Sequence, residues 1–139
     1  MPDLKVTGKG DMSNSKATVI NNNFRFQNAY RNGQSFVSRT VITYVVPRRT
    51  GGLRYGITAS RKVGCAVERN RARRVIKAAV TELIPIMEGS FELIFVSRKA
   101  TVESKSWMVR QVLYGHLKKA GVIRNDVAVL NVDDRRQDG

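Results

Sequence analysis

Cysteine, histidine and acidic residues are scarce in this chain. Its 139 residues include one cysteine, Cys65, one histidine, His116, and 11 aspartates and glutamates in total. A single cysteine excludes an intrachain disulfide and a thiolate metal cluster within one chain, which fits a reducing cytoplasm. No acidic pair is spaced for metal or general acid–base chemistry, and there is no phosphate-loop or dinucleotide fingerprint. We therefore predict no catalytic residue in the protein, and the sequence leaves open where a protein-bound metal would sit.

Long apolar runs are also missing. No segment approaches the roughly 18 to 20 apolar residues that a membrane span needs. The chain begins MPDLKVTGKGDMSNSK, without the apolar middle of a secretory signal. We expect a cytoplasmic protein with no membrane contact, and a chain of this length has room for one modest core in a single domain.

What the chain has in excess is positive charge. Lysine and arginine together number 25, which leaves a formal net charge of +14. A surface of this kind repels itself unless a polyanion neutralises it, so charge by itself is compatible with nucleic acid or an anionic membrane as the partner. A bland excess of solubilising charge is the alternative, and composition does not separate RNA from DNA.

The first half of the chain predicts a helix followed by strands. Residues 1–20 are rich in Gly, Ser, Asn and Lys and are expected to form a flexible basic arm before a domain at 21–132, with a disordered tail at 133–139. FRFQNAYRNG, capped by Asn22 or Asn23, is typical of a short helix that ends at Gly33. SFVSRTVITYVV alternates like one long strand or two, and a Pro- and Gly-containing turn leads to a further strand, LRYGITAS.

The second half predicts helix, strand, helix. After Gly64 the apolar period becomes about 3.6, which indicates a helix with one buried stripe. The stripe comprises Ala72, Val75, Ile76, Ala79, Val80 and Leu83. FELIFVS is typical of a buried strand, and Thr101 is expected to cap a last long helix that ends before Gly121. The order of helix, strands, helix, strand, helix predicts an α+β fold, a single-domain α-β sandwich.

The most one-sided stretch is RKVGCAVERNRARRVIK, where one acid, Glu68, stands among many cations. Its basic residues are Arg61, Lys62, Arg69, Arg71, Arg73, Arg74 and Lys77. At about 100° per residue, Arg69, Arg73 and Lys77 share a stripe opposite the apolar one. Guanidinium groups bind phosphate oxygens with two parallel hydrogen bonds, so this face favours nucleic-acid binding over a merely solvated surface.

Three aromatic residues, Phe26, Tyr30 and Tyr44, are candidates to stack on unpaired bases. The alternative is that they belong to the core, as aromatics at helical spacing usually do. For His116 we expect a polar or half-buried structural role, and for Cys65 that of a small residue at a tight turn.

The segment RYGITASRKVGCAVERNRARRVIK resembles the signature of bacterial ribonuclease P proteins. That pattern is a strand that ends in Ser and two basic residues, followed by Val-Gly-x-Ala-Val-x-Arg-Asn-Arg-x-basic-Arg. Phe26, Tyr30 and Gly33 match the family's first helix, and the order of elements agrees from about residue 20 to 122. Cys65 and the pair Thr58-Ala59 depart from the usual pattern.

The resemblance implies a left-handed crossover between two parallel strands, against the general handedness rule. It also implies a function, in which the protein is the accessory subunit of a ribonucleoprotein endoribonuclease. A catalytic RNA subunit holds most of the Mg²⁺ and removes the 5′ leader of precursor tRNA. Ribonuclease P RNA and precursor tRNA would be the partners, with no obligate protein partner.

Carried over by position, the resemblance implies two groups of RNA-binding residues. Those expected to face the leader are Phe26, Tyr30, Tyr44, Arg69, Asn70, Arg73 and Lys77. Those expected to face the catalytic RNA are Arg61, Lys62, Arg71 and Arg74. Helical phase motivates this split.

Three alternatives stay open at this point. A ribosomal or ribosome-assembly protein shares the small size and basicity. A metal-dependent nuclease would need an acidic cluster. A DNA-binding protein would need a helix-turn-helix spacing, which the sequence lacks.

Overall fold

One five-stranded mixed sheet organises the molecule, in the strand order β1-β4-β5-β3-β2. The computed structural model describes residues 17–20 and 22–123, and the strands within them are β1 Ala17–Val19, β2 Gln34–Val37, β3 Val41–Pro47, β4 Leu53–Thr58 and β5 Phe91–Ser97. β4 pairs in parallel with both β1 and β5, whereas β3 pairs antiparallel with β5 and β2. The β-branched run expected to form one or two strands forms two.

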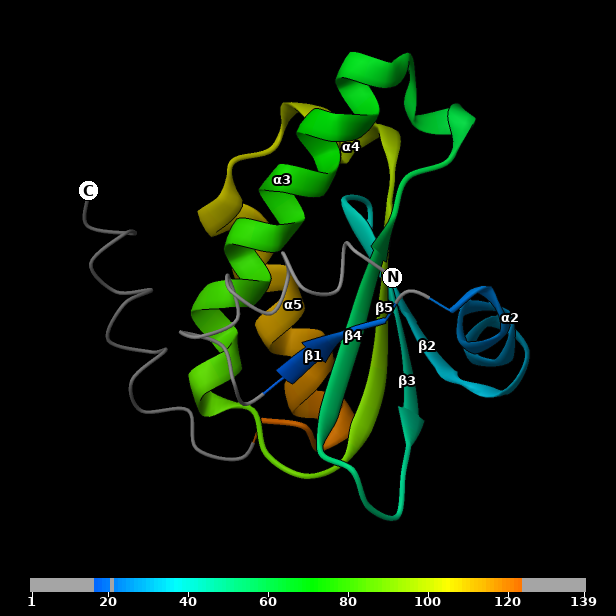
Figure 1. Ribbon diagram of the computed structural model, residues 1–139. Coiled ribbons are helices and arrows are strands. Elements are labelled where there is room, and N and C mark those ends of the chain that lie inside the picture. The colour runs from blue at the N-terminus through cyan, green and yellow to red at the C-terminus, as the bar shows by residue number, and fades with distance from the viewer. Residues whose placement is uncertain (1–16, 21, 124–139) are drawn as a thin grey trace, which may run out of the picture.

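Helices cover both faces of this sheet (Figure 1). The helices are α2 Asn23–Asn32, α3 Ala66–Leu83, α4 Lys99–Glu103 and α5 Ser106–Ala120, with 3₁₀ turns at Arg61–Val63 and Ile84–Ile86. α2 lies alone against one face, and α3 and α5 pack on the other. The predicted α-β sandwich and its order of elements are confirmed.

The connection from β4 through α3 to β5 is left-handed. In Figure 1 both strands run upward, β4 lies in front of β5, and α3 lies to their left. The chain rises along β4, crosses to the left, descends along α3 and then rises again along β5, which lies farther from the viewer. This path turns anticlockwise as it moves away from the viewer, so the crossover is left-handed. The general preference for right-handed crossovers predicts the opposite, so the expectation taken from the family resemblance is the correct one.

Alternation along β3 divides the core into two parts. Val41, Thr43 and Val45 are buried beneath α3 and α5, while Ile42, Tyr44 and Val46 face α2 and are half-buried. The larger part is built from α3, α5 and the sheet. Its largest members include Ile76, Leu83, Leu93, Phe95, Leu113 and Leu117. The apolar stripe predicted for α3 is buried apart from Val75, which is half-buried.

The flexible arm was expected to extend through residue 20, but its last residues belong to the folded domain. Residues 17–19 form β1, which pairs with β4, and Ala17 and Ile20 are only 2% and 5% exposed. A strand of three residues is too short for its apolar alternation to be recognised after a Gly- and Ser-rich sequence. Its pairing with β4 provides hydrogen-bond partners for its backbone N–H and C=O groups. The rest of the arm, the domain end at 132 and the tail at 133–139 lie outside the described residues.

The expectation that Thr101 caps the last long helix is also wrong. Thr101 lies inside the short helix α4, where its hydroxyl accepts the backbone N–H of Arg98 at 2.9 Å and donates to the Thr40 carbonyl. The chain is extended at Ser104, so α5 begins separately at Ser106. Thr101 therefore caps α4 from within and ties it to the β2–β3 loop.

His116 is a structural residue that joins α5 to the sheet. Its Nδ1 lies 2.9 Å from the Thr43 hydroxyl oxygen, and its ring stacks on Phe36 with a centroid distance of 5.8 Å. Burial, and to a lesser degree the charge of Lys119, lower the pKa of His116 below its usual 6.5. The folded protein therefore favours the neutral ring.

Acidification is expected to destabilise the fold through this ring. Because the folded-state pKa lies below the unfolded one, the unfolded chain takes up the proton first, so stability is complete above pH 6.5 and falls as the pH drops below it. Urea unfolding between about pH 7 and 5 measures the effect, and His116→Asn should show a shallower dependence. Equal slopes in both proteins would contradict this assignment.

Candidate nucleic-acid interface

Strand pairing arranges the α2 face of the sheet as three rows of side chains. The row nearest the β4–α3 connection, the crossover row, contains Ile42, Val96 and Thr58. The middle row contains Tyr44, Ile94 and Gly56. The row nearest the β3–β4 turn, the hairpin row, contains Val46, Glu92 and Arg54.

Helix α2 crosses this face over the middle row. A Cβ atom at Gly56 would lie 2.7 Å from two ring carbons of Phe26, so this ring rests directly on the β4 backbone. Ala29 is fully buried, and Tyr30 meets Tyr44 edge to face with ring centroids 5.1 Å apart. Tyr30 is still 38% exposed. Phe26 thus packs mainly against the sheet, whereas the tyrosine pair keeps ring surface available to a base.

Two residues of the crossover row line a pocket of about 700 Å³. Ile42 and Val96 give it an apolar base, and basic residues surround that base. The basic residues are Arg39, Lys62, Arg98 and Lys99. Ser97 also lines the pocket, and its buried hydroxyl has no hydrogen-bond partner within the described part of the chain. An apolar floor with a cationic rim suits a nucleotide, whose base is flat and whose phosphate is anionic.

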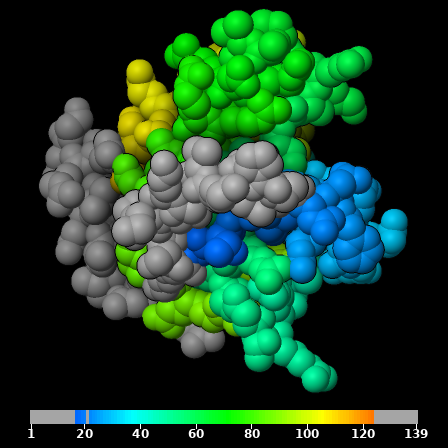
Figure 2. Space-filling view, viewed as in Figure 1, coloured from blue at the N-terminus to red at the C-terminus, as the bar shows by residue number. Residues whose placement is uncertain are grey.

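The start of α3 projects beyond the sheet, at the top of Figures 1 and 2. Gly64 adopts a φ of 147°, which favours glycine, and its carbonyl accepts a hydrogen bond from Arg69 Nη1 at 2.9 Å. Glu68 accepts the backbone N–H of Cys65 at 2.9 Å. The one acid of the basic segment is therefore used to cap the helix.

Three arginines of this segment, Arg69, Arg71 and Arg73, donate hydrogen bonds, and none of its basic side chains pairs with an acid of the described residues. Arg71 Nε donates to the Val102 carbonyl at 3.1 Å, and Arg73 Nη1 donates to Asn70 Oδ1 at 2.9 Å. The ion pairs among residues 17–20 and 22–123 involve Glu82 or Glu92, and none includes a basic residue of 61–77. The positive charge of this surface is thus left for an external anion to neutralise.

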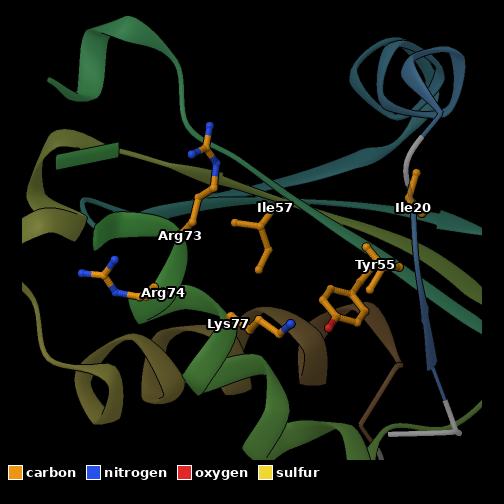
Figure 3. Close-up of a pocket in the computed structure, with 7 residues that line it drawn as sticks. Ile20, Tyr55, Ile57, Arg73, Arg74 and Lys77 are labelled. Atoms are coloured by element: carbon orange, nitrogen blue, oxygen red, sulfur yellow. The ribbon is translucent and has the colours of Figure 1, made fainter. Parts of the chain in front are cut away.

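Arg73, Arg74 and Lys77 lie together around a second pocket of about 280 Å³, between α3 and the edge strand β1. Its apolar lining is Val19, Ile20, Tyr55 and Ile57. Figure 3 shows Lys77 extending toward Tyr55, with Arg73 and Arg74 pointing away from the pocket floor.

This grouping bears on the expected split between leader-facing and RNA-facing residues, which stays a prediction. Arg73 and Lys77 line the pocket beside β1, which does not include Tyr30 or Tyr44. Ile20 joins the two regions, because it lines this pocket and also packs with Phe26 and Tyr44. Arg74, which helical phase assigned to the other group, lies beside them. The angular position of each residue around the helix predicts which side of the helix is polar. It does not predict which face of the sheet the helix covers.

Comparison with known proteins identifies the family. A family model described as Ribonuclease P matches residues 15–121, most of the chain. The chain belongs to the ribonuclease P protein family. The ribonuclease P protein component of Clostridium botulinum (strain Loch Maree / Type A3) is 32% identical over 108 residues, 77% of this chain and 97% of that protein. The component from Symbiobacterium thermophilum is 30% identical over 112 residues, 80% of this chain and 97% of that protein.

Solved structures of ribonuclease P proteins share the fold. The Staphylococcus aureus protein matches with a TM-score of 0.66 and 26% identity, over 76% of this chain and 97% of that one. The Thermotoga maritima protein, at 22% identity, matches with a TM-score of 0.63 over 72% of this chain and 94% of that one. This family assignment favours a ribonuclease P protein over the ribosomal and DNA-binding alternatives.

Proposed function

We propose that this protein is the RNA-binding subunit of a ribonuclease P ribonucleoprotein that removes the 5′ leader from precursor tRNA. The observation that carries the proposal is the unneutralised basic surface of residues 61–77 in a chain of this family. Ribonuclease P RNA and precursor tRNA supply the polyanions that such a surface needs.

The two faces of the sheet suggest two kinds of RNA contact. The Tyr30–Tyr44 pair and the adjacent pocket over the crossover row suit the single-stranded leader, because unpaired bases stack on aromatic rings beside a basic rim. On the other side, Arg73, Arg74 and Lys77 suit backbone phosphates. We propose that these three act on one RNA partner, the catalytic RNA, together with the remaining basic residues of the segment. Those residues are Arg61, Lys62, Arg69 and Arg71, with Asn70 beside them.

Mg²⁺ and the catalytic groups are assigned to the RNA subunit in this proposal. The described residues contain no group of three or more His, Cys, Asp or Glu that would hold a metal ion, so no step is assigned to a protein-bound ion. The protein's part is to bind and align RNA and to offset phosphate repulsion. No helix within 17–20 and 22–123 is long and apolar enough to cross a bilayer.

Reconstitution tests the proposal. Added to a bacterial ribonuclease P RNA at low Mg²⁺, the protein is expected to accelerate removal of the leader, because it supplies cations that the RNA otherwise draws from solution. Cleavage is followed on gels with 5′-labelled precursor tRNA. Unchanged cleavage by the RNA, or cleavage by the protein without RNA, would contradict the proposed role.

A further inference from the structure

The hairpin row holds a buried carboxylate surrounded by arginines from three elements. Glu92 of β5 is 4% exposed and forms an ion pair with Arg25 of α2. Arg48, in the turn directly after β3, places its Nε 4.0 Å from the same carboxylate. Arg54 of β4 is the direct register partner of Glu92 and lies on the same face of the sheet. We call Arg25, Arg48, Arg54 and Glu92 the hairpin cluster.

The charges of the hairpin cluster do not balance. Three guanidinium groups against one carboxylate leave a net charge of +2 on these side chains. Burial, and then the charges of Arg48 and Arg25, lower the pKa of Arg54, and Glu92 offsets only part of this effect. The free protein therefore holds like charges close together at a partly buried position, which costs stability unless an anion binds there.

The start of α2 adds to this positive potential. Arg25 lies in the first turn of α2, and that turn contains no acidic residue. The N-terminus of a helix carries a partial positive charge, so a cation there is unfavourable and an anion is favourable. Glu92 compensates for Arg25, but it then has less capacity to neutralise Arg48 and Arg54.

We propose that Arg25, Arg48 and Arg54 form a phosphate-binding site for RNA, held in place by Glu92. The site lies across α2 from the pocket over the crossover row, so it is separate from the tyrosine pair and from the basic segment of α3. Arg25 from a helix, Arg48 from a turn and Arg54 from a strand lie around one carboxylate. Guanidinium groups bind phosphate oxygens with parallel hydrogen bonds, so this excess of arginines suits a phosphodiester. This inference rests on the proposed function, since it adds a contact to the same RNA complex.

The test compares Arg54→Gln and Arg48→Gln with Arg49→Gln in the full-length protein. Arg49 is exposed on the same turn, so its substitution removes the same charge without touching the carboxylate. Two affinities are measured over a range of salt: that of the protein for ribonuclease P RNA, and that of the holoenzyme for precursor tRNA with a long or a short leader. A loss in the first affinity indicates that the site binds a phosphate of the catalytic RNA. A loss in the second that depends on leader length indicates a phosphate of the leader.

Each cluster substitution is expected to weaken one of these affinities about tenfold, and Arg49→Gln less than twofold. The slope of log affinity against log salt should also fall by about 0.7 to 0.9, a change that a purely structural defect would not produce. Equal affinities and slopes for Arg54→Gln, Arg48→Gln and Arg49→Gln would overturn the inference. If the wild-type protein neither bound the RNA nor accelerated cleavage in the same assay, the proposed function would fail instead.

Discussion

Replacing Arg73, Arg74 and Lys77 together with glutamine is expected to weaken binding to ribonuclease P RNA roughly a thousandfold at low salt. These side chains surround one pocket and have no carboxylate partner among the described residues, so their charge is available to phosphates. A charge-assisted hydrogen bond contributes about 1.5 kcal/mol or more, or roughly tenfold in affinity. Filter-binding titrations over a range of salt should also give a slope of log affinity against log salt that is smaller by about 2.1 to 2.7.

The control removes the same number of charges elsewhere. Lys105, Lys118 and Lys119 belong to α5 or precede it and do not line the pocket. Their replacement with glutamine should reduce affinity by less than about fivefold, because distant charges are screened within about 10 Å at moderate salt. An equal loss in both triple variants would mean that net charge, not position, governs binding.

Single substitutions in the same pocket test whether Arg73 and Arg74 of α3 bind the same RNA or two different RNAs. Because Arg73 and Arg74 line the same pocket, Arg73→Gln and Arg74→Gln are expected to weaken the same RNA contact. If Arg73→Gln lowered only leader affinity while Arg74→Gln lowered only assembly with the RNA subunit, the split by helical phase would be confirmed.

Much of the fold follows from the period of apolar residues. The alternation at Val41, Thr43 and Val45 and the 3.6-residue spacing of Ala72, Ile76 and Leu83 correspond to surfaces that are buried in the structure. Such patterns reveal what one element buries, because each residue's side is determined by its own backbone. They do not reveal how elements connect in space, so the left-handed crossover was available only from the family resemblance.

Because sequence patterns do not reveal how elements meet in space, only part of the candidate site could be predicted from the sequence. The basic segment of α3 is continuous in the chain, so its charge is visible in the sequence. The rim of the crossover-row pocket joins Arg39 and Lys62 to Arg98, and the hairpin cluster joins α2 to β5. Strand pairing brings these residues together from distant positions. No spacing rule connects them, so the prediction missed both groupings, although it included Lys62 as an RNA-binding residue.

Tyr30→Ala is expected to weaken the binding of single-stranded leader RNA by roughly 10- to 100-fold. Stacking of a base on an aromatic side chain contributes about 1 to 3 kcal/mol. Tyr30 is 38% exposed and lies against Tyr44, whose row neighbours the crossover row. Tyr30→Phe should retain most of the affinity, because the ring provides the contact. The measurement is the affinity of the holoenzyme for precursor tRNA with and without a leader, and the leaderless substrate should be unaffected.

Phe24 provides a matched control on the same helix. It is 72% exposed and stands about 200° around α2 from Phe26, so it points away from the sheet. Phe24→Ala should therefore leave leader affinity within about twofold. Tyr44→Ala should weaken leader binding like Tyr30→Ala, and the double variant should lose less than the sum, because Tyr44 supports the ring of Tyr30 edge to face. Full additivity, or an equal loss from Phe24→Ala, would show that the two tyrosines do not act as one stacking surface.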